Sequence, residues 1–279
     1  MLEHYSVFVP EFHLEGGKHF ALVSDSVALE DMPEIARSSG APLTVFITGT
    51  SGARVNVRFF NQAGKEKPES DSGALVVAHH LGSSCTVVMP GGELPVELES
   101  GAAWTFQGDF HIWPTAFDES EWLEALGISS SDLDPFHKIH EAGNDDKRNV
   151  VVSVNFSALD SIQPNLERIA ELNARTGTNG LILAAFDSPR AIADFRFFAP
   201  RKGILEDNAG SFTLSCLCGY RAAYMAGGTY RWSVAQGFAM GKPSSLLARF
   251  STRESMAQSV RVGGVVRSTQ EDSVWRIER

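Results

Sequence analysis

A series of features in the first half of the sequence recurs in the second half in the same order. In each half, a helical segment is followed by two strand-like runs, a loop and a second helix. Matching landmarks are Arg58-Phe-Phe with Arg196-Phe-Phe, and Glu69-x-x-x-Gly-Ala with Glu206-x-x-x-Gly-Ser. Several matches in one order are hard to attribute to chance. They predict a tandem duplication, and therefore two lobes of similar construction.

The spacing of apolar residues predicts the elements of each copy. Those of the first copy are a helix over Met32–Arg37, strands over Leu43–Ile47 and Val55–Phe60, and a helix from about Asp71 to Leu81. Those of the second are a helix over Leu166–Leu172, strands over Gly180–Phe186 and Ala193–Phe198, and a helix that opens at Asp207–Ser211. Further strand-like runs are Cys85–Met89, Leu94–Glu99, Ala103–Gln107, Tyr230–Gln236, Leu246–Phe250, Arg261–Val266 and Ser273–Ile277.

Short alternating strands with few helices predict α+β lobes built on mostly antiparallel sheets. The polar, turn-rich segment His111–Ser120 is interpreted as a crossing between the lobes, and Asn144–Arg148 as an exposed loop. The strands after Ser255 lie beyond the second copy, so we expect them to return to the first lobe. The predicted lobes are residues 1–112 with about 256–279, and residues 113–255.

Composition narrows the class of partner. Hydrophobic residues make up 43% and charged residues 21% of 279 residues, which is typical of a globular protein. A net charge of −10, with the basic residues dispersed, argues against a nucleic-acid partner. No apolar run approaches the ~20 residues of a membrane-spanning helix. The first residues contain acids where a signal peptide needs basic ones, so a cytoplasmic location is expected.

Three cysteines, Cys85, Cys216 and Cys218, stand in apolar surroundings, which favours buried free thiols. No Cys or His partner stands at metal-ligand spacing from them, so no metal site is expected. The sequence also lacks a P-loop, a Gly-x-Gly-x-x-Gly after a strand, a His-Glu-x-x-His and a Gly-x-Ser-x-Gly.

Both copies place glycine and small polar residues where a loop gives way to a helix, at Ser70–Ala74 and Asp207–Ser211. A helix start offers free backbone N–H groups and a partial positive charge, which suit a carboxylate or phosphate. Two such starts facing across a cleft would hold a small acidic molecule between acid/base groups of both lobes. The alternative interpretation is that Asp71 or Ser72, and Asn208 or Ser211, only cap the two helices.

Motifs along nearly the whole chain resemble those of the PhzF-like (phenazine biosynthesis-like) family, of the diaminopimelate epimerase-like superfamily. They are Met32-x-x-Ile-Ala-Arg37, Arg58-Phe-Phe with Glu66-x-Pro68, Arg196-Phe-Phe-Ala-Pro200 with Gly203-Ile-x-Glu-Asp207 and Gly210-Ser211, Gln236-Gly-x-x-x-Gly-Lys-Pro-Ser244, and Arg261-Val-Gly-Gly264. The resemblance implies a diaminopimelate epimerase-like fold of two pseudo-symmetric lobes, each with a curled sheet around a central helix. It also implies a homodimer without a cofactor, in which protons are moved on small amino-acid-like or cyclic acids.

The chain departs from the family at the residues that carry its chemistry. Leu43, in Pro42-Leu43-Thr44, stands where the family has its acid/base glutamate, and Ser72 stands where it has histidine. Lys18 replaces the asparagine of an early Gly-Asn-Pro, and one residue is missing between Ala209 and Gly210. A leucine cannot abstract a proton, so the usual isomerase mechanism is not supported. Neither Cys85 nor Cys216 provides the thiol pair of the related racemases.

The candidate catalytic residues are Asp207, which matches the family, and Asp71, which could supply the missing acid/base group. Helix capping is the alternative role for both. The candidate substrate-binding residues are Ser72, Gly73, Ala74, Gly210, Ser211, His19 and Thr44. Glu69, Glu206 and the pair His79-His80 fit structural roles, and Lys18 a solvated one.

Two hypotheses of function follow from these residues. The first is a cofactor-independent isomerase-like enzyme acting on a small carboxylate, with a reaction diverted towards cyclisation or elimination. The second is a catalytically inactive binding or scaffold protein that has kept the cleft. A nucleophilic or metal enzyme on this fold is a distant third.

Overall fold

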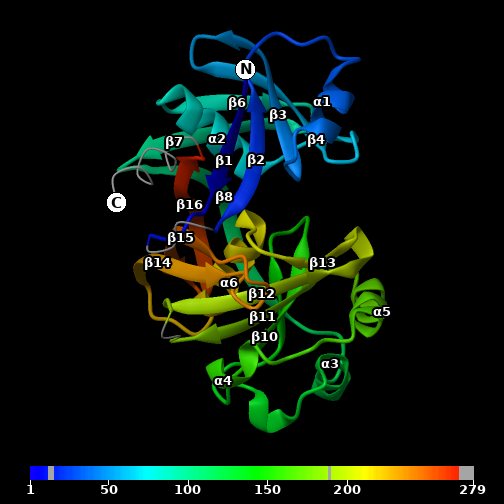
Figure 1. Ribbon diagram of the computed structural model, residues 1–279. Coiled ribbons are helices and arrows are strands. Elements are labelled where there is room, and N and C mark those ends of the chain that lie inside the picture. The colour runs from blue at the N-terminus through cyan, green and yellow to red at the C-terminus, as the bar shows by residue number, and fades with distance from the viewer. Residues whose placement is uncertain (12–15, 188–189, 270–279) are drawn as a thin grey trace, which may run out of the picture. The chain divides into compact units, whose positions relative to one another are not determined.

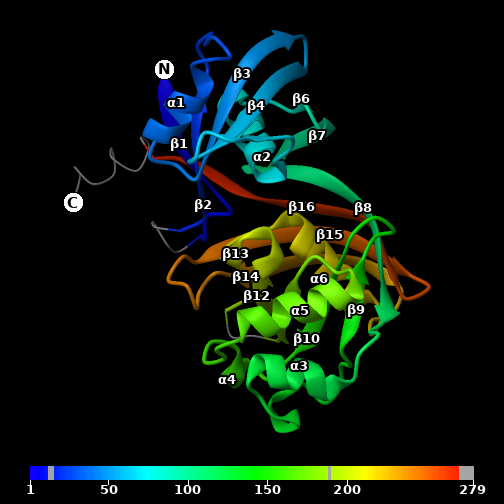
Figure 2. The same ribbon diagram turned by 90° about the vertical axis from the view of Figure 1, so that its right-hand side faces the viewer.

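The computed structural model describes residues 1–11, 16–187 and 190–269. The chain divides into two compact units, here called unit 1 (Met1–Phe106 with residues from Gly263 onward) and unit 2 (Gln107–Val262) (Figures 1 and 2). The divisions fall inside two long strands, β8 (Ala102–Pro114) and β16 (Met256–Ser268), each of which has residues in both units. Unit 2 thus begins a few residues before position 113 and ends a few residues after position 255.

Unit 1 is a curved sheet with α2 as its most deeply buried helix. Its elements are β1 (Leu2–Val7), β2 (Lys18–Val23), α1 (Met32–Ser38), β3 (Leu43–Ser51), β4 (Arg54–Asn61), β5 (Glu66–Lys67), α2 (Asp71–Leu81), β6 (Cys85–Met89) and β7 (Gly92–Glu99). The strand order is β16-β1-β2-β3-β4-β6-β7-β8, with β5 paired to β4. The β2–β3 and β4–β6 pairs are parallel, whereas the β1–β2, β3–β4, β6–β7 and β7–β8 pairs are antiparallel. Every residue of α2 from Ser72 to Ala78 is buried, because small and apolar side chains let the sheet surround it.

Unit 2 adds more helices to the same plan. Its elements are α3 (Glu119–Leu126), the 3-10 turn η1 (Ser130–Asp132), β9 (His140–Gly143), β10 (Arg148–Ser153), α4 (Phe156–Leu159), α5 (Leu166–Thr176), β11 (Leu181–Phe186), β12 (Ala193–Ala199), the 3-10 turn η2 (Pro200–Lys202), β13 (Ile204–Asp207), α6 (Ser211–Ala222), β14 (Gly228–Gln236) and β15 (Ser244–Arg253). The strand order is β8-β9-β10-β11-β12-β14-β15-β16, with β13 paired to β12.

The duplication expected from the sequence is present in the topology. In unit 2 the parallel pairs are β10–β11 and β12–β14, at the places that β2–β3 and β4–β6 occupy in unit 1. The paired arginines also keep one role: Arg58 Nε donates to Glu66 (2.7 Å), and Arg196 Nε donates to Glu206 (2.9 Å). The partner that matches Glu206 is therefore Glu66, and the sequence-based match with Glu69 was wrong.

Two clusters of apolar side chains show how helices attach to the sheets. In unit 1, Met32 and Ala36 of α1 pack on Phe46 and Phe60. In unit 2, α3 and α5 cover β10 and β11 with a cluster that includes Trp122, Leu126, Ile169 and Leu172. The apolar stripe of α5 predicted this helix, and the Asn165 side chain caps it by accepting from Arg168 N–H (3.1 Å).

Most predicted elements are confirmed, and the exceptions have local causes. The segment His111–Ser120 is not a continuous loop: β8 continues to Pro114, and α3 begins at Glu119. The run Ser273–Ile277 lies outside the described residues. The sequence did not predict β1, β2, β5, β9, β10, β13, α3 or α4, and seven of these eight elements have six residues or fewer. Within the described residues, no helix is long and apolar enough to cross a membrane.

Candidate functional site

The start of α6 carries polar groups that the side chains of the helix do not satisfy. Its N-cap residue is Gly210, which has no side chain to cap the helix. The Ser211 hydroxyl is buried in a residue that is only 4% exposed, and within the described part of the chain it has no hydrogen-bond partner. A side chain at position 210 would meet Thr213 Oγ1 at 2.9 Å, which explains the glycine there. The helix thus begins with first-turn N–H groups and a hydroxyl that its own side chains leave unsatisfied.

Gln236 holds the turn that leads into this helix. Its side chain is fully buried, its Nε2 donates to the Asp207 carbonyl (2.6 Å), and its Oε1 accepts from Gly210 N–H (3.1 Å). Gly237 follows with φ +80°, and a Cβ there would lie 2.3 Å from the Lys242 carbonyl and 2.9 Å from Asn208 Cβ. Asn208 Nδ2 in turn donates to Ser244 Oγ (3.4 Å). The segment from Gln236 to Ser244 therefore fixes the shape of the 207–210 turn.

Asp207 places a carboxylate close to this helix start. It ends β13, where it pairs with Phe197 of β12, and its Oδ1 accepts from Ala209 N–H (3.5 Å). Its Oδ2 lies 3.6 Å from the position that a Cβ of Gly210 would occupy. Of the residues predicted from sequence, Asp207, Gly210 and Ser211 are thus brought together in unit 2.

The start of α2 in unit 1 is built differently. Ser70 is the N-cap, and its hydroxyl accepts from Gly73 N–H (3.1 Å). Ala74 N–H donates to the Ser70 carbonyl (3.0 Å). Gly73 is needed for packing, because a Cβ there would lie 2.5 Å from Phe59 Cε1. The N–H groups of Gly73 and Ala74, two predicted ligand donors, are therefore taken up within the helix, which leaves Asp71 and Ser72 as the unit 1 candidates.

Two other predicted residues lie on a different sheet face. Tyr5 of β1 contacts His80 of α2 (2.9 Å), so the face that carries Tyr5 is the one that α2 covers. Because side chains alternate along a strand, His19 and Thr44 point to the opposite face. Thr44 is fully buried there, and its hydroxyl donates to Ser39 (2.9 Å). The structure does not bring these two together with Ser72.

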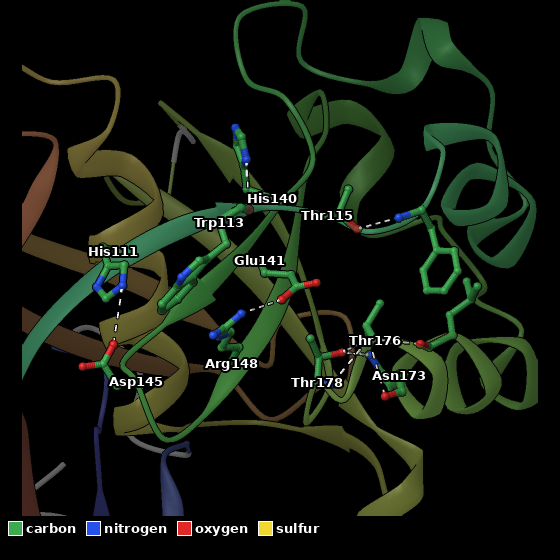
Figure 3. A network of polar contacts seen from close by, with 12 residues as sticks. His111, Trp113, Thr115, His140, Glu141, Asp145, Arg148, Asn173, Thr176 and Thr178 are labelled. Atoms are coloured by element: carbon green, nitrogen blue, oxygen red, sulfur yellow. Dashed lines mark hydrogen bonds and ion pairs between the residues drawn. The ribbon is translucent and has the colours of Figure 1, made fainter.

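His19 forms a stacked pair with His4, with ring centroids 5.2 Å apart. Burial is the main cause that lowers the pKa of His19, and the neighbouring His4 lowers it further. The strand registers place Glu141 and Arg148 of unit 2 at the positions of His4 and His19. Figure 3 shows that pair, joined at 3.5 Å. A side-chain pair at this position in both units fits a structural role for His19.

Two further contacts in Figure 3 brace the loop that joins β9 to β10. The Arg148 guanidinium lies 3.9 Å from the centre of the Trp113 ring, and His111 lies 3.8 Å from Asp145. These contacts tie the exposed 144–147 turn to β8. The Arg148 guanidinium pairs with the buried Glu141 carboxylate, whose side chain is only 7% exposed, so no ligand is needed to explain this buried charge.

The three cysteines are free and buried, as the sequence indicated. Burial raises the pKa of Cys216 and Cys218 well above the ordinary thiol value, so neither is a ready nucleophile. In the described ranges, no group of three His, Cys, Asp or Glu side chains could hold a metal ion.

Gln236, Asn208 and Ser244 were not predicted as site residues from the sequence. Their signal was present, because Gln236-Gly and Lys242-Pro-Ser244 belong to a motif that the sequence shares with the PhzF-like family. Only the structure shows that this motif shapes the turn before α6.

Comparison with known proteins gives consistent results. Residues 16–269 match the family described as phenazine biosynthesis-like protein (PhzC-PhzF). An uncharacterized isomerase of Deinococcus radiodurans is 26% identical, over 93% of this chain and 90% of that protein.

Solved structures with the same fold include a PhzF-family phenazine biosynthesis protein of Bacillus anthracis (TM-score 0.80, 18% identity, 96% of each chain). A hydroxyproline epimerase of Agrobacterium vitis, solved with bound trans-4-hydroxy-L-proline, is more distant (TM-score 0.55, 9% identity, 96% of this chain and 90% of that one). The matched range, the two-unit α+β fold and the motif around α6 agree: this chain belongs to the phenazine biosynthesis-like (PhzC-PhzF) family.

Proposed function

We propose that the protein is a cofactor-independent isomerase-type enzyme that moves a proton on a small carboxylate. The start of α6 binds the substrate carboxylate, and Asp207 is the first proton-transfer group. Asp71, at the start of α2, is the second group. The family supports an isomerase-type activity, because a curated relative carries that description.

The observation that carries the proposal is the unsatisfied Ser211 hydroxyl. A buried hydroxyl without a partner costs about 1–3 kcal/mol, a cost that a bound acceptor removes. The N–H groups of the first turn of α6 point the same way, and the helix dipole favours a negative charge there. A carboxylate supplies both the charge and two acceptor oxygens.

The chemistry follows from the residues at that point. A carboxylate bound at the helix start has its negative charge stabilised, which makes the neighbouring C–H more acidic. Asp207 takes this proton as the base, and Asp71 returns one as the acid to another atom of the same molecule. Return to carbon gives an isomer, and return to a departing oxygen gives an elimination product. Leu43 has no proton to offer, so Asp71 takes the role that the family assigns to its glutamate.

The test is proton exchange followed by NMR. The protein is incubated in deuterated water with small amino acids and cyclic carboxylic acids, beside Asp207→Asn, Asp71→Asn and Ser211→Ala. We expect deuterium at one carbon of one compound, lost at least about 100-fold in either aspartate variant. Ser211→Ala is expected to weaken substrate binding about tenfold. Asp118→Asn is the control, since that exposed side chain makes no capping bond to α3.

A binding or scaffold role is the second candidate, and one feature of unit 1 favours it. Ser70 already satisfies two N–H groups at the start of α2, and Leu43 is not titratable. Ligand-induced shifts at α6 without deuterium incorporation into any compound would support this candidate and contradict the enzyme.

A further inference from the structure

A separate pocket lies near the C-terminal end of α6, and all its residues belong to unit 2. Its volume is about 360 Å³, within the range of small-molecule sites. Arg221, in the last turn of α6, is ten residues beyond Ser211, so the pocket is about 15 Å along the helix from the site proposed above. Its lining includes Asp134, Phe136, His137, Phe186, Arg221 and Tyr224.

A chain of hydrogen bonds orients a guanidinium in this pocket. His137 Nδ1 lies 2.6 Å from Asp134 Oδ2, which fixes the imidazole with its proton on Nδ1. The Nε2 lone pair then accepts from Arg221 Nη1. Asp134 also accepts from the backbone N–H of Phe136 (2.9 Å) and from Ser153 (3.3 Å). Although burial opposes it, these bonds together lower the pKa of Asp134. Asp134 and His137 are therefore committed to positioning Arg221.

The Arg221 guanidinium has N–H groups that can still bind a ligand. Among the described residues, no carboxylate lies within ion-pair distance of its guanidinium, although Asp134 and Asp187 line the same pocket. A guanidinium carries five N–H donors in a planar fork that matches a carboxylate, and His137 uses only one. Its charge rests over the Phe186 ring, with the guanidinium carbon 4.9 Å from the ring centre.

Aromatic side chains make up the rest of the wall. The ring of Tyr224 meets that of His137 edge to face, with centroids 4.6 Å apart. Phe136 lines the pocket and is nevertheless 81% exposed, which is unusual for a large apolar side chain. A planar ring between such walls would cover this exposed surface.

We propose that this pocket is a second ligand site, which binds a small aromatic carboxylate. The carboxylate pairs with Arg221, held in place by His137 and Asp134, and the ring packs against Phe136 and Tyr224. The site is independent of the start of α6 and needs no proton transfer.

The test is a fluorine NMR titration of the full chain with 4-fluorobenzoate, compared with 4-fluorobenzylamine and 4-fluorotoluene. Because the carboxylate carries the pairing, we expect only 4-fluorobenzoate to bind this pocket. Arg221→Gln is expected to weaken binding at least about tenfold, and Phe136→Ala several-fold. Phe136 is exposed, so its replacement leaves the fold intact. Arg231→Gln, an exposed arginine on β14, is the control and should bind as the unchanged protein does.

The Ser211→Ala variant distinguishes binding at the Arg221 pocket from binding at the start of α6. If 4-fluorobenzoate is bound by Arg221, then Ser211→Ala leaves its affinity unchanged, and Arg221→Gln leaves any proton exchange at α6 unchanged. The proposal is overturned if Arg221→Gln binds with full affinity, if only Ser211→Ala removes binding, or if the amine binds as well as the acid.

Discussion

Asp194 is a buried carboxyl whose ionisation works against the fold. It is 2% exposed in β12, and burial raises its pKa to about 7 even though Arg190 stands beside it. The unfolded value is about 3.9, so at neutral pH the folded state keeps a proton that the unfolded state has lost. The stabilisation that comes from the proton bound to folded Asp194 is fully present below about pH 4 and is lost as the pH rises through 7.

Replacing Asp194 should therefore change how stability depends on pH. We expect Asp194→Asn to flatten the decline in unfolding free energy between about pH 4 and 7, by on the order of 2–4 kcal/mol. Urea unfolding at several pH values measures it. Asp160→Asn is the matched control, because Asp160 bonds the same Arg190 (2.9 Å) but is half exposed. An equal effect of both variants would show that the loss of an Arg190 partner, and not burial, is the cause.

Ser211 and Ser215 provide a second comparison of single residues in one helix. Both hydroxyls are buried, but Ser215 Oγ donates to the Ser211 carbonyl (3.0 Å), whereas Ser211 Oγ has no partner among the described residues. Alanine raises helix propensity equally at both places. Ser211→Ala should then stabilise the free protein by roughly 1 kcal/mol relative to Ser215→Ala, as read from thermal unfolding. A less stable Ser211→Ala protein would mean that this hydroxyl is already satisfied without a ligand.

The loop that joins β14 to β15 shapes the candidate site through two glycines. Gly237 (φ +80°) is confined by the Lys242 carbonyl, whereas a Cβ at Gly241 (φ +67°) would meet nothing within 4 Å. Gly241→Ala should cost only the left-handed backbone penalty, about 1 kcal/mol. Gly237→Ala adds a collision and should cost at least about 2 kcal/mol more, while also weakening substrate binding at α6. Chemical denaturation and the NMR titration measure the two effects. Equal losses in both variants would contradict the bracing role of this loop.

The two helix starts show where prediction from sequence succeeds and where it stops. The apolar pattern located α2 and α6, and the shared motif pointed to Asp207, Gly210 and Ser211. The sequence could not show that Ser70 caps α2, because the neighbouring Asp71 and Ser72 are equally good capping residues. The pairing of Gly73 with Gly210 failed for the same reason: Gly210 precedes its helix, whereas Gly73 lies in the first turn. A shift of two or three residues along a helix start is invisible to periodicity.

At the scale of the whole molecule, the repeated Arg–Glu pair allows one change to be compared in two units. Arg196 is 6% exposed in its side chain and also donates to the Leu159 and Ile162 carbonyls (3.1 and 2.7 Å). Arg58 is 33% exposed, and its bonds are to Glu66. Arg196→Gln should cost about 3–5 kcal/mol of unfolding free energy, and Arg58→Gln about 1 kcal/mol. Equal costs would mean that burial does not distinguish the two pairs.

The duplication itself was predictable because it depends on patterns repeated in order. The strand order was not, since β1 and β9 are short, and one partner of β1 is β16, near the other end of the described residues. The Arg221 pocket could not be predicted at all: Asp134 and His137 lie more than eighty residues before Arg221, and nothing in the sequence indicates that they meet.

The division of β16 has a consequence for how the chain is made. Unit 2 is one continuous stretch, whereas the sheet of unit 1 includes residues 266–268, which pair with β1 near the N-terminus. On the ribosome, residues 107–262 are therefore complete before the last strand of the other sheet has emerged. Until then β1 has β2 on one side and an open edge on the other. During synthesis, the first half of the protein to be made is the last to be finished.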